Sequence, residues 1–85
     1  MTQFTPDQNT YTEVTLEEGL IALESDRADR LYSDGLESDE YIYHSYKGFC
    51  YEDHCVIGHE VEDTMNTLIS LKWPLNHKFY IKNKE

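Results

Sequence analysis

Two cysteines and two histidines stand close together in the middle of the chain, and these residue types can bind zinc or supply a reactive thiol. They are Cys50, His54, Cys55 and His59. Structural zinc sites usually place paired ligands roughly two to four residues apart. Here four residues separate the cysteines, and the adjacent His54 and Cys55 side chains diverge if the segment is extended. We therefore expect two half-buried thiols and two surface imidazoles on a hairpin, with zinc binding as the less favoured alternative.

Nucleophilic catalysis would require a cysteine with a lowered pKa and a histidine base such as His44, His54 or His59. The sequence places neither a cluster of positive charge nor a helix N-terminus next to either cysteine. The four glycines stand singly, so there is no glycine-rich loop to hold a phosphate. Carboxylates are so abundant that no single pair indicates acid–base catalysis. We expect no enzyme activity, no catalytic residues and no cofactor.

The acidic residues themselves are the stronger candidate for function. The chain has a formal net charge of −10, and sixteen of its seventeen acidic residues precede residue 64, whereas four of its seven basic residues follow that position. Such a charge repels nucleic acid and anionic membranes, and it attracts cationic partners. We therefore expect the chain to bind a cationic protein surface, with no direct binding to nucleic acid or membrane.

Part of this charge is dense enough to imitate a nucleic-acid backbone. Residues four apart on a helix lie about 6 Å apart, and alternate residues on a strand lie about 6.6–6.8 Å apart. Both spacings are similar to those of phosphates along one strand. The carboxylates that we expect to contact the partner are Asp26, Asp29, Asp34, Glu37, Asp39 and Glu40. A solvated acidic face with no partner is the alternative.

Tyrosine is the other abundant type, with seven in 85 residues. Tyrosine is enriched at binding hot spots because it offers rigid contact area and a hydroxyl group. Tyr41 and Tyr43 share one strand face, and Ile42 lies on the other. If Ile42 faces the core, the two tyrosines face outward among carboxylates, and we expect them to contact the partner. A plain sheet surface is the alternative, because tyrosine also favours strands.

Two helices are expected to support these residues. Thr15 and Glu18 form a capping box, and the apolar spacing that follows predicts a helix over about residues 16–24. Gly19 weakens this helix by about 1 kcal/mol relative to alanine, although it permits close packing. Val61, Met65, Leu68 and Ile69 predict a second helix over about residues 61–71, which Pro74 stops.

Short strands are expected around these helices, at residues 28–32, 40–46, 49–51, 55–57 and 78–82, with a further short strand possible near 11–14. The strands from residue 28 to residue 57 read as a meander, with a tight turn at Lys47-Gly48. Phe79 and Ile81 should face inward on the last strand. The fold class is α+β: an antiparallel sheet of three to five strands with two short helices. We expect a flexible arm over residues 1–14 and a single domain over residues 15–85.

A pattern shared with one protein family runs through Thr15–Leu23, Tyr41–Tyr43 and Asp63–Trp73. It resembles small phage proteins that block the Thoeris defence by sequestering its cyclic nucleotide signal. The resemblance covers about residues 15–81 and implies a protein that sequesters a nucleotide. Trp73 is the position of this chain that matches the family's pattern. The family also has a basic stretch and a tryptophan after its first helix, where this chain has acidic residues from Asp26 onward.

The leading hypothesis is a non-enzymatic, phage-encoded inhibitor of a host defence or nucleic-acid-processing protein, of anti-CRISPR or anti-restriction type. It would occupy a cationic nucleic-acid site through a DNA-mimicking acidic surface. One alternative is a sponge for a cyclic nucleotide, which would use Arg27, Arg30 and Lys72. Another is a small acidic adaptor between proteins, and homo-oligomers are possible.

The cell compartment follows from what the sequence does not contain. No apolar run approaches the roughly 18 residues that a bilayer span requires, and the first nine residues are polar rather than signal-like. Two cysteines do not make a disulfide framework. We expect a cytoplasmic protein, in the host cell if it is phage-encoded.

Overall fold

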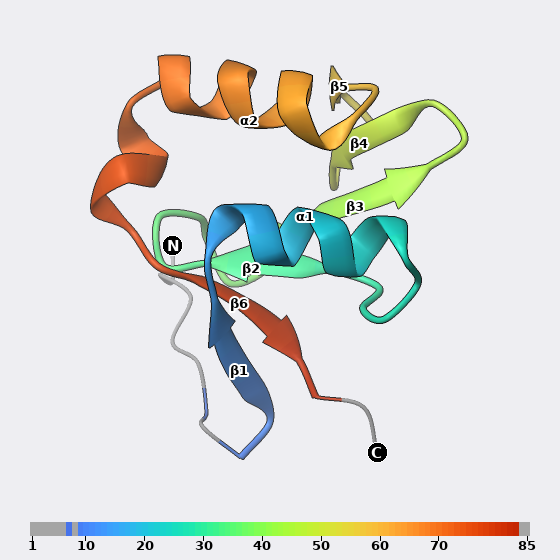
Figure 1. Cartoon of the computed structure of the whole chain (residues 1–85). Helices are drawn as coiled ribbons and strands as arrows, with labels where there is room; N and C mark the ends of the chain where they lie inside the picture. Colours follow the sequence, from blue (N-terminus) through green and yellow to red (C-terminus); the bar gives the residue numbers. More distant parts are fainter. Residues whose placement is uncertain (1–6, 8, 84–85) are drawn as a thin grey trace.

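Six antiparallel strands, two α-helices and one 3-10 helix make up the computed structural model over the residues that it describes, which are residue 7 and residues 9–83 (Figure 1). The elements follow one another as β1 (Tyr11–Val14), α1 (Leu16–Glu24), β2 (Leu31–Ser33), β3 (Ile42–Ser45), β4 (Gly48–Tyr51), β5 (Val56–Gly58), α2 (Val61–Ser70), the 3-10 helix η1 (Trp73–Asn76) and β6 (Phe79–Lys82). The predicted α+β class is confirmed. The sheet has six strands, one more than the upper end of the predicted range.

The sheet has the order β1-β6-β2-β3-β4-β5, so the last strand lies between the first two. Phe79 pairs with Val14 on one side and with Ser33 on the other. Strands β2 to β5 form the expected meander. Because β1 is paired along its whole length, the folded unit begins before Thr15, whereas the sequence predicted an arm through Val14. The predicted flexibility of residues 1–6 and 8 concerns positions outside the described residues.

Helix α1 has the predicted bounds and the predicted capping box. The Thr15 hydroxyl accepts the backbone N–H of Glu18 at 3.1 Å, and the Glu18 carboxylate accepts the N–H of Thr15 at 2.9 Å. Gly19 faces the sheet, where a Cβ atom would come within 2.5 Å of the buried Leu31 side chain. The glycine therefore lets α1 pack closely on β2, which outweighs its weak helix propensity.

Helix α2 ends at Ser70, before Pro74, which the sequence indicated as the residue that stops it. Lys72 has a left-handed backbone conformation, with φ at 69°, and turns the chain away from the helix axis. Pro74 then lies in the first turn of η1, where a proline costs no hydrogen bond. The residue that the sequence indicated as a helix stop therefore begins a short helix that was not predicted.

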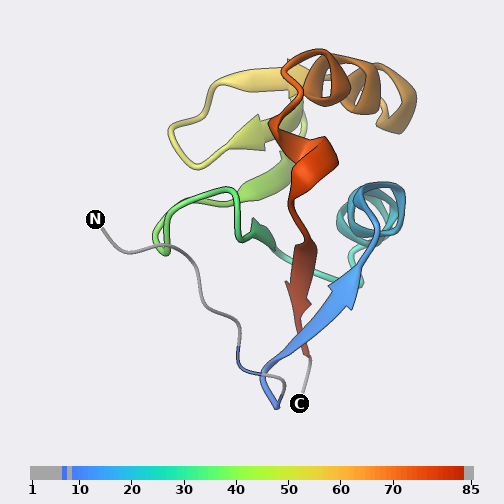
Figure 2. The same cartoon turned by 90° about the vertical axis from the view of Figure 1, so that its left-hand side faces the viewer.

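The core lies between the helices and one face of the sheet. Leu20, Leu31, Ile42, Phe49 and Leu68 are fully buried there, and α1 and α2 lie on the same side of the strands (Figure 2). Because successive strand residues point to opposite faces, the neighbours of these core residues in β2 and β3 point to the face away from the helices. That face carries the tyrosines.

Candidate binding surface

Four tyrosines and one histidine form a continuous row of rings, which we call the aromatic ladder. The row runs Tyr11, Tyr32, Tyr41, Tyr43 and His54, with ring centroids 5.3, 6.2, 6.2 and 5.8 Å apart in that order. It links β1 and β2 to the turn between β4 and β5. Tyr41 and Tyr43 share the face that the sequence predicted, opposite the fully buried Ile42, and both are partly exposed.

Polar contacts hold the ladder in place. The Tyr43 hydroxyl and His54 Nδ1 are 2.5 Å apart. The Arg30 guanidinium carbon lies 4.3 Å from the centre of the Tyr41 ring, and the Arg30 side chain hydrogen-bonds Tyr32. Desolvation, followed by the neighbouring Cys50, raises the pKa of Tyr43. These contacts thus fix the orientation of the rings.

Five carboxylates gather beside one end of this ladder, and we call them the acidic cluster. They are Glu37, Asp39 and Glu40 from the β2–β3 loop and Glu52 and Asp53 from the β4–β5 turn. Partial desolvation, then the charges of Glu40 and Asp39, raise the pKa of Glu37. Partial desolvation, then Asp53, Glu40 and Asp39, raise the pKa of Glu52. The carboxylates of the two loops are therefore close enough for their charges to interact.

Backbone contacts fix the shape of both loops. The Glu40 carboxylate accepts the N–H of Glu37 at 2.8 Å, and the Glu40 N–H donates to the Glu37 carbonyl at 3.0 Å. Asp53 accepts the N–H of Cys55 at 3.0 Å, and this bond lowers the pKa of Asp53. Three predicted residues thus belong to the cluster. The sequence analysis did not single out Glu52 and Asp53.

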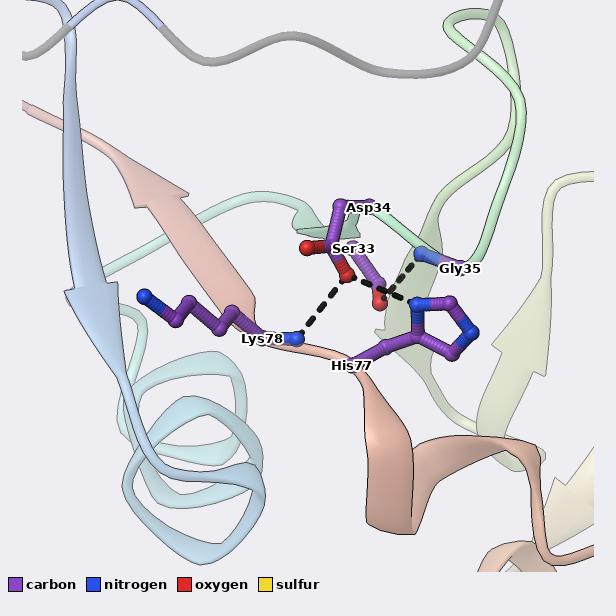
Figure 3. Close-up of polar contacts among 5 residues, drawn as sticks. All are labelled: Ser33, Asp34, Gly35, His77 and Lys78. Atoms are coloured by element: carbon purple, nitrogen blue, oxygen red, sulfur yellow. Dashed lines mark hydrogen bonds and ion pairs between the residues drawn. The ribbon is translucent and has the colours of Figure 1, made fainter.

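Asp34 lies outside the cluster and has a structural role instead, as its contacts in Figure 3 show. One of its carboxylate oxygens accepts the backbone N–H of Lys78 at 2.9 Å and lies 3.1 Å from His77 Nδ1. Next to it, the Gly35 N–H donates to the buried Ser33 hydroxyl at 3.1 Å. These bonds tie the end of β2 to the start of β6, so Asp34 stabilises the centre of the sheet.

Asp26 and Asp29 also lie away from the cluster. Both belong to the connection between α1 and β2, and Asp26 has a left-handed backbone conformation with φ at 62°. They therefore precede β2, whereas the cluster begins beyond its other end. The predicted acidic surface from Asp26 to Glu40 is divided by this strand into two separate regions.

The cysteines and histidines are dispersed over different contacts. Cys50 is buried and Cys55 is exposed, so the prediction of two half-buried thiols is wrong. A hydrogen bond to Asp53 and its charge raise the pKa of the Cys55 thiol, the opposite of what an activated nucleophile needs. His59 Nδ1 lies 3.0 Å from the carbonyl oxygen of Lys47. Among residues 7 and 9–83, no three His, Cys, Asp or Glu side chains are grouped as metal ligands.

A hollow of about 850 Å³ lies at the other end of the ladder. Arg30, Tyr32, Lys82 and Asn83 line it together with Asp29. Of the three cations named for a nucleotide sponge, only Arg30 lines this hollow. Arg27 instead donates from Nε to the Ser25 hydroxyl at 2.9 Å, and Lys72 follows α2.

Comparisons of this chain with protein-family models, with curated proteins and with solved structures found no match. The resemblance to the Thoeris-blocking family therefore stays a prediction. Neither α1 nor α2, nor any other helix in the described part of the chain, combines the length and hydrophobicity that a membrane span needs.

The raised pKa values of the cluster lead to a pH-dependent prediction. We expect the double variant Glu37→Gln, Glu52→Gln to be more stable than the parent protein at pH 7. A carboxyl whose pKa is raised by folding binds more protons in the native state, so it lowers stability as pH rises above the ordinary glutamate range. Below about pH 3 both side chains are protonated in either state, and the difference should vanish.

Thermal unfolding of the variant and the parent protein at pH 7 and at pH 3 measures this difference. A gap in Tm that is the same at both pH values would show that electrostatic repulsion within the cluster is not its cause.

Proposed function

We propose that this protein is a non-enzymatic inhibitor that occupies a cationic nucleic-acid site on another protein. The acidic cluster would supply the charge, and Tyr41 and Tyr43 would supply contact area. One observation carries the proposal: two loops that are apart in sequence bring Glu52 close enough to Glu40 and Asp39 for their charges to raise its pKa, in addition to desolvation and the charge of Asp53. Maintaining such repulsion in a small domain is costly unless a cationic partner relieves it.

The shape of the cluster also favours this reading. Its loops are held by backbone hydrogen bonds, so the carboxylates are presented in a fixed arrangement. A fixed arrangement reduces the entropy lost on binding. A net charge of −10 on 85 residues would also steer the protein toward a basic groove. These properties suit a phage-encoded antagonist of a defence or nucleic-acid-processing enzyme in the host cytoplasm.

Competition with DNA and salt tests this function. The protein is immobilised and used to capture partners from a bacterial lysate, and the captured material is then challenged with duplex DNA or RNA and with increasing salt. We expect a nucleic acid and salt each to release the main captured protein, since both compete for the same cationic site. A partner that resists nucleic acid and salt alike would contradict the proposal.

The hollow at the other end of the ladder favours a second candidate function, a sponge for a small anion. Arg30 and Lys82 line it with Tyr32, so it offers positive charge beside an aromatic ring. A cyclic nucleotide that raised the Tm of the parent protein, but not of the variant Arg30→Ala, Lys82→Ala, would favour this candidate.

A further inference from the structure

The aromatic ladder already binds one arginine, and that arginine belongs to the chain itself. The guanidinium carbon of Arg30 lies 4.3 Å from the Tyr41 ring centre, and the same side chain hydrogen-bonds Tyr32. The chain also contains a lysine–tyrosine pair, in which Lys47 Nζ lies 5.7 Å from the Tyr46 ring centre at an exposed hairpin tip. The arginine is the more closely seated cation, and its ring belongs to the ladder.

Charge changes along the ladder. Arg30 lies over Tyr41, the middle ring of the row, and lines the hollow together with Tyr32 and Lys82. Tyr43 is the next ring after Tyr41, lies beside His54 and feels the charge of Asp53. A cation from a partner is therefore repelled from Tyr32 and Tyr41, which lie beside Arg30, and attracted toward Asp53 at the Tyr43 end.

A guanidinium group suits this end better than an ammonium group does. It is planar, so it can stack on a tyrosine ring while its edge donates paired hydrogen bonds to a carboxylate. A lysine ammonium is a compact and strongly hydrated charge that does not combine these two contacts in the same way. Tyr43 is partly exposed and feels the charge of the Asp53 carboxylate, so its ring and this carboxylate together provide both parts of an arginine site.

We propose that the Tyr43 end of the ladder, together with the acidic cluster, selects arginine over lysine in the protein segment that it binds. This inference rests on the proposed function and adds the residue type by which the partner is recognised. The occupant is an arginine-bearing segment of a protein, held by stacking on Tyr43 and by hydrogen bonds to carboxylates such as Asp53.

Two synthetic peptides of equal length and charge, one rich in arginine and one rich in lysine, test this inference. Their affinities for the protein are measured by fluorescence anisotropy over a range of salt concentrations. We expect the arginine peptide to bind about tenfold more tightly, the ratio that a stacked and partly desolvated guanidinium provides. Tyr43→Leu should reduce this preference to nearly one while salt-dependent binding persists.

Matched variants separate recognition from folding. Tyr46→Leu changes a tyrosine that is 94% exposed and outside the ladder, so it should keep the full preference. Tyr43→Phe keeps the ring and should keep most of the preference. If Tyr43→Leu does not fold, Asp53→Asn carries the test, because an asparagine can still accept the Cys55 N–H. Asp53→Asn should weaken the arginine peptide more than the lysine peptide.

The outcomes distinguish the inference from the function on which it rests. Equal, salt-dependent binding of both peptides would overturn arginine selection and leave the cationic-partner proposal standing. The absence of salt-dependent binding by either peptide would overturn both.

Discussion

Reversing the charges of Glu37, Asp39 and Glu40 to lysine should abolish binding of the cationic partner without unfolding the protein. The three residues share one loop of the acidic cluster, so the substitutions replace attraction by repulsion at a single place on the surface. Placing like charges opposite one another costs several kcal/mol, so we expect affinity to fall by about a hundredfold or more. Titration calorimetry or anisotropy with the captured partner measures the loss.

The matched control reverses three acidic residues elsewhere. Glu17, Glu24 and Glu62 are exposed on the two helices and outside the cluster. Their reversal changes the net charge equally, so it should slow association at low salt but keep most of the affinity. Equal losses in both triple variants would show that total charge, rather than the cluster, attracts the partner. An intact CD spectrum and Tm exclude unfolding as the cause.

Replacing Gly48 with alanine should produce the largest loss of stability from a single added methyl group. Gly48 has φ at +113°, a conformation that side chains rarely adopt, and a Cβ atom there would lie 2.4 Å from the Gly58 carbonyl oxygen. Neither backbone can move without breaking the β4–β5 pairing. Strain and overpacking together should cost about 3 kcal/mol, which lowers Tm by about 10–20 °C in a domain of this size.

Thermal or urea unfolding checks this prediction, with Lys47→Ala as the control in the same turn. Lys47 is exposed, so its replacement should change stability by less than about 0.5 kcal/mol. If Gly48→Ala unfolded at the same temperature as the parent protein, the close approach of β4 to the Gly58 backbone would be incorrect.

Local signals in the sequence predicted the helices well. Thr15 and Glu18 are three residues apart and cap the same helix turn, and the apolar spacing from Val61 to Ile69 follows one helix face. These patterns depend on neighbours along the chain, so no tertiary information is needed to read them. Pro74 shows the limit, because a proline is compatible both with the end of one helix and with the start of another.

Long-range placement was not predictable in the same way. No local feature of residues 79–82 indicates that they lie between β1 and β2. The division of the acidic residues has the same origin: Asp29 and Glu37 are close in sequence, but β2 carries the chain from one end of the sheet to the other between them. Glu52 comes close enough to feel the charges of Glu40 and Asp39 only because the β3–β4 hairpin returns the chain to that end.

The central position of β6 also has a consequence for the order in which the sheet can form. Strands β2 to β5 are neighbours in sequence and can pair by short loop closures. Among the described residues, β1 pairs with β6 alone, across the 64 residues from 15 to 78, so none of its backbone groups has a sheet partner until residues 79–82 arrive. During synthesis the meander can therefore assemble first, with α1 packed on β2, while β1 remains exposed to chaperones and proteases until the last strand is made.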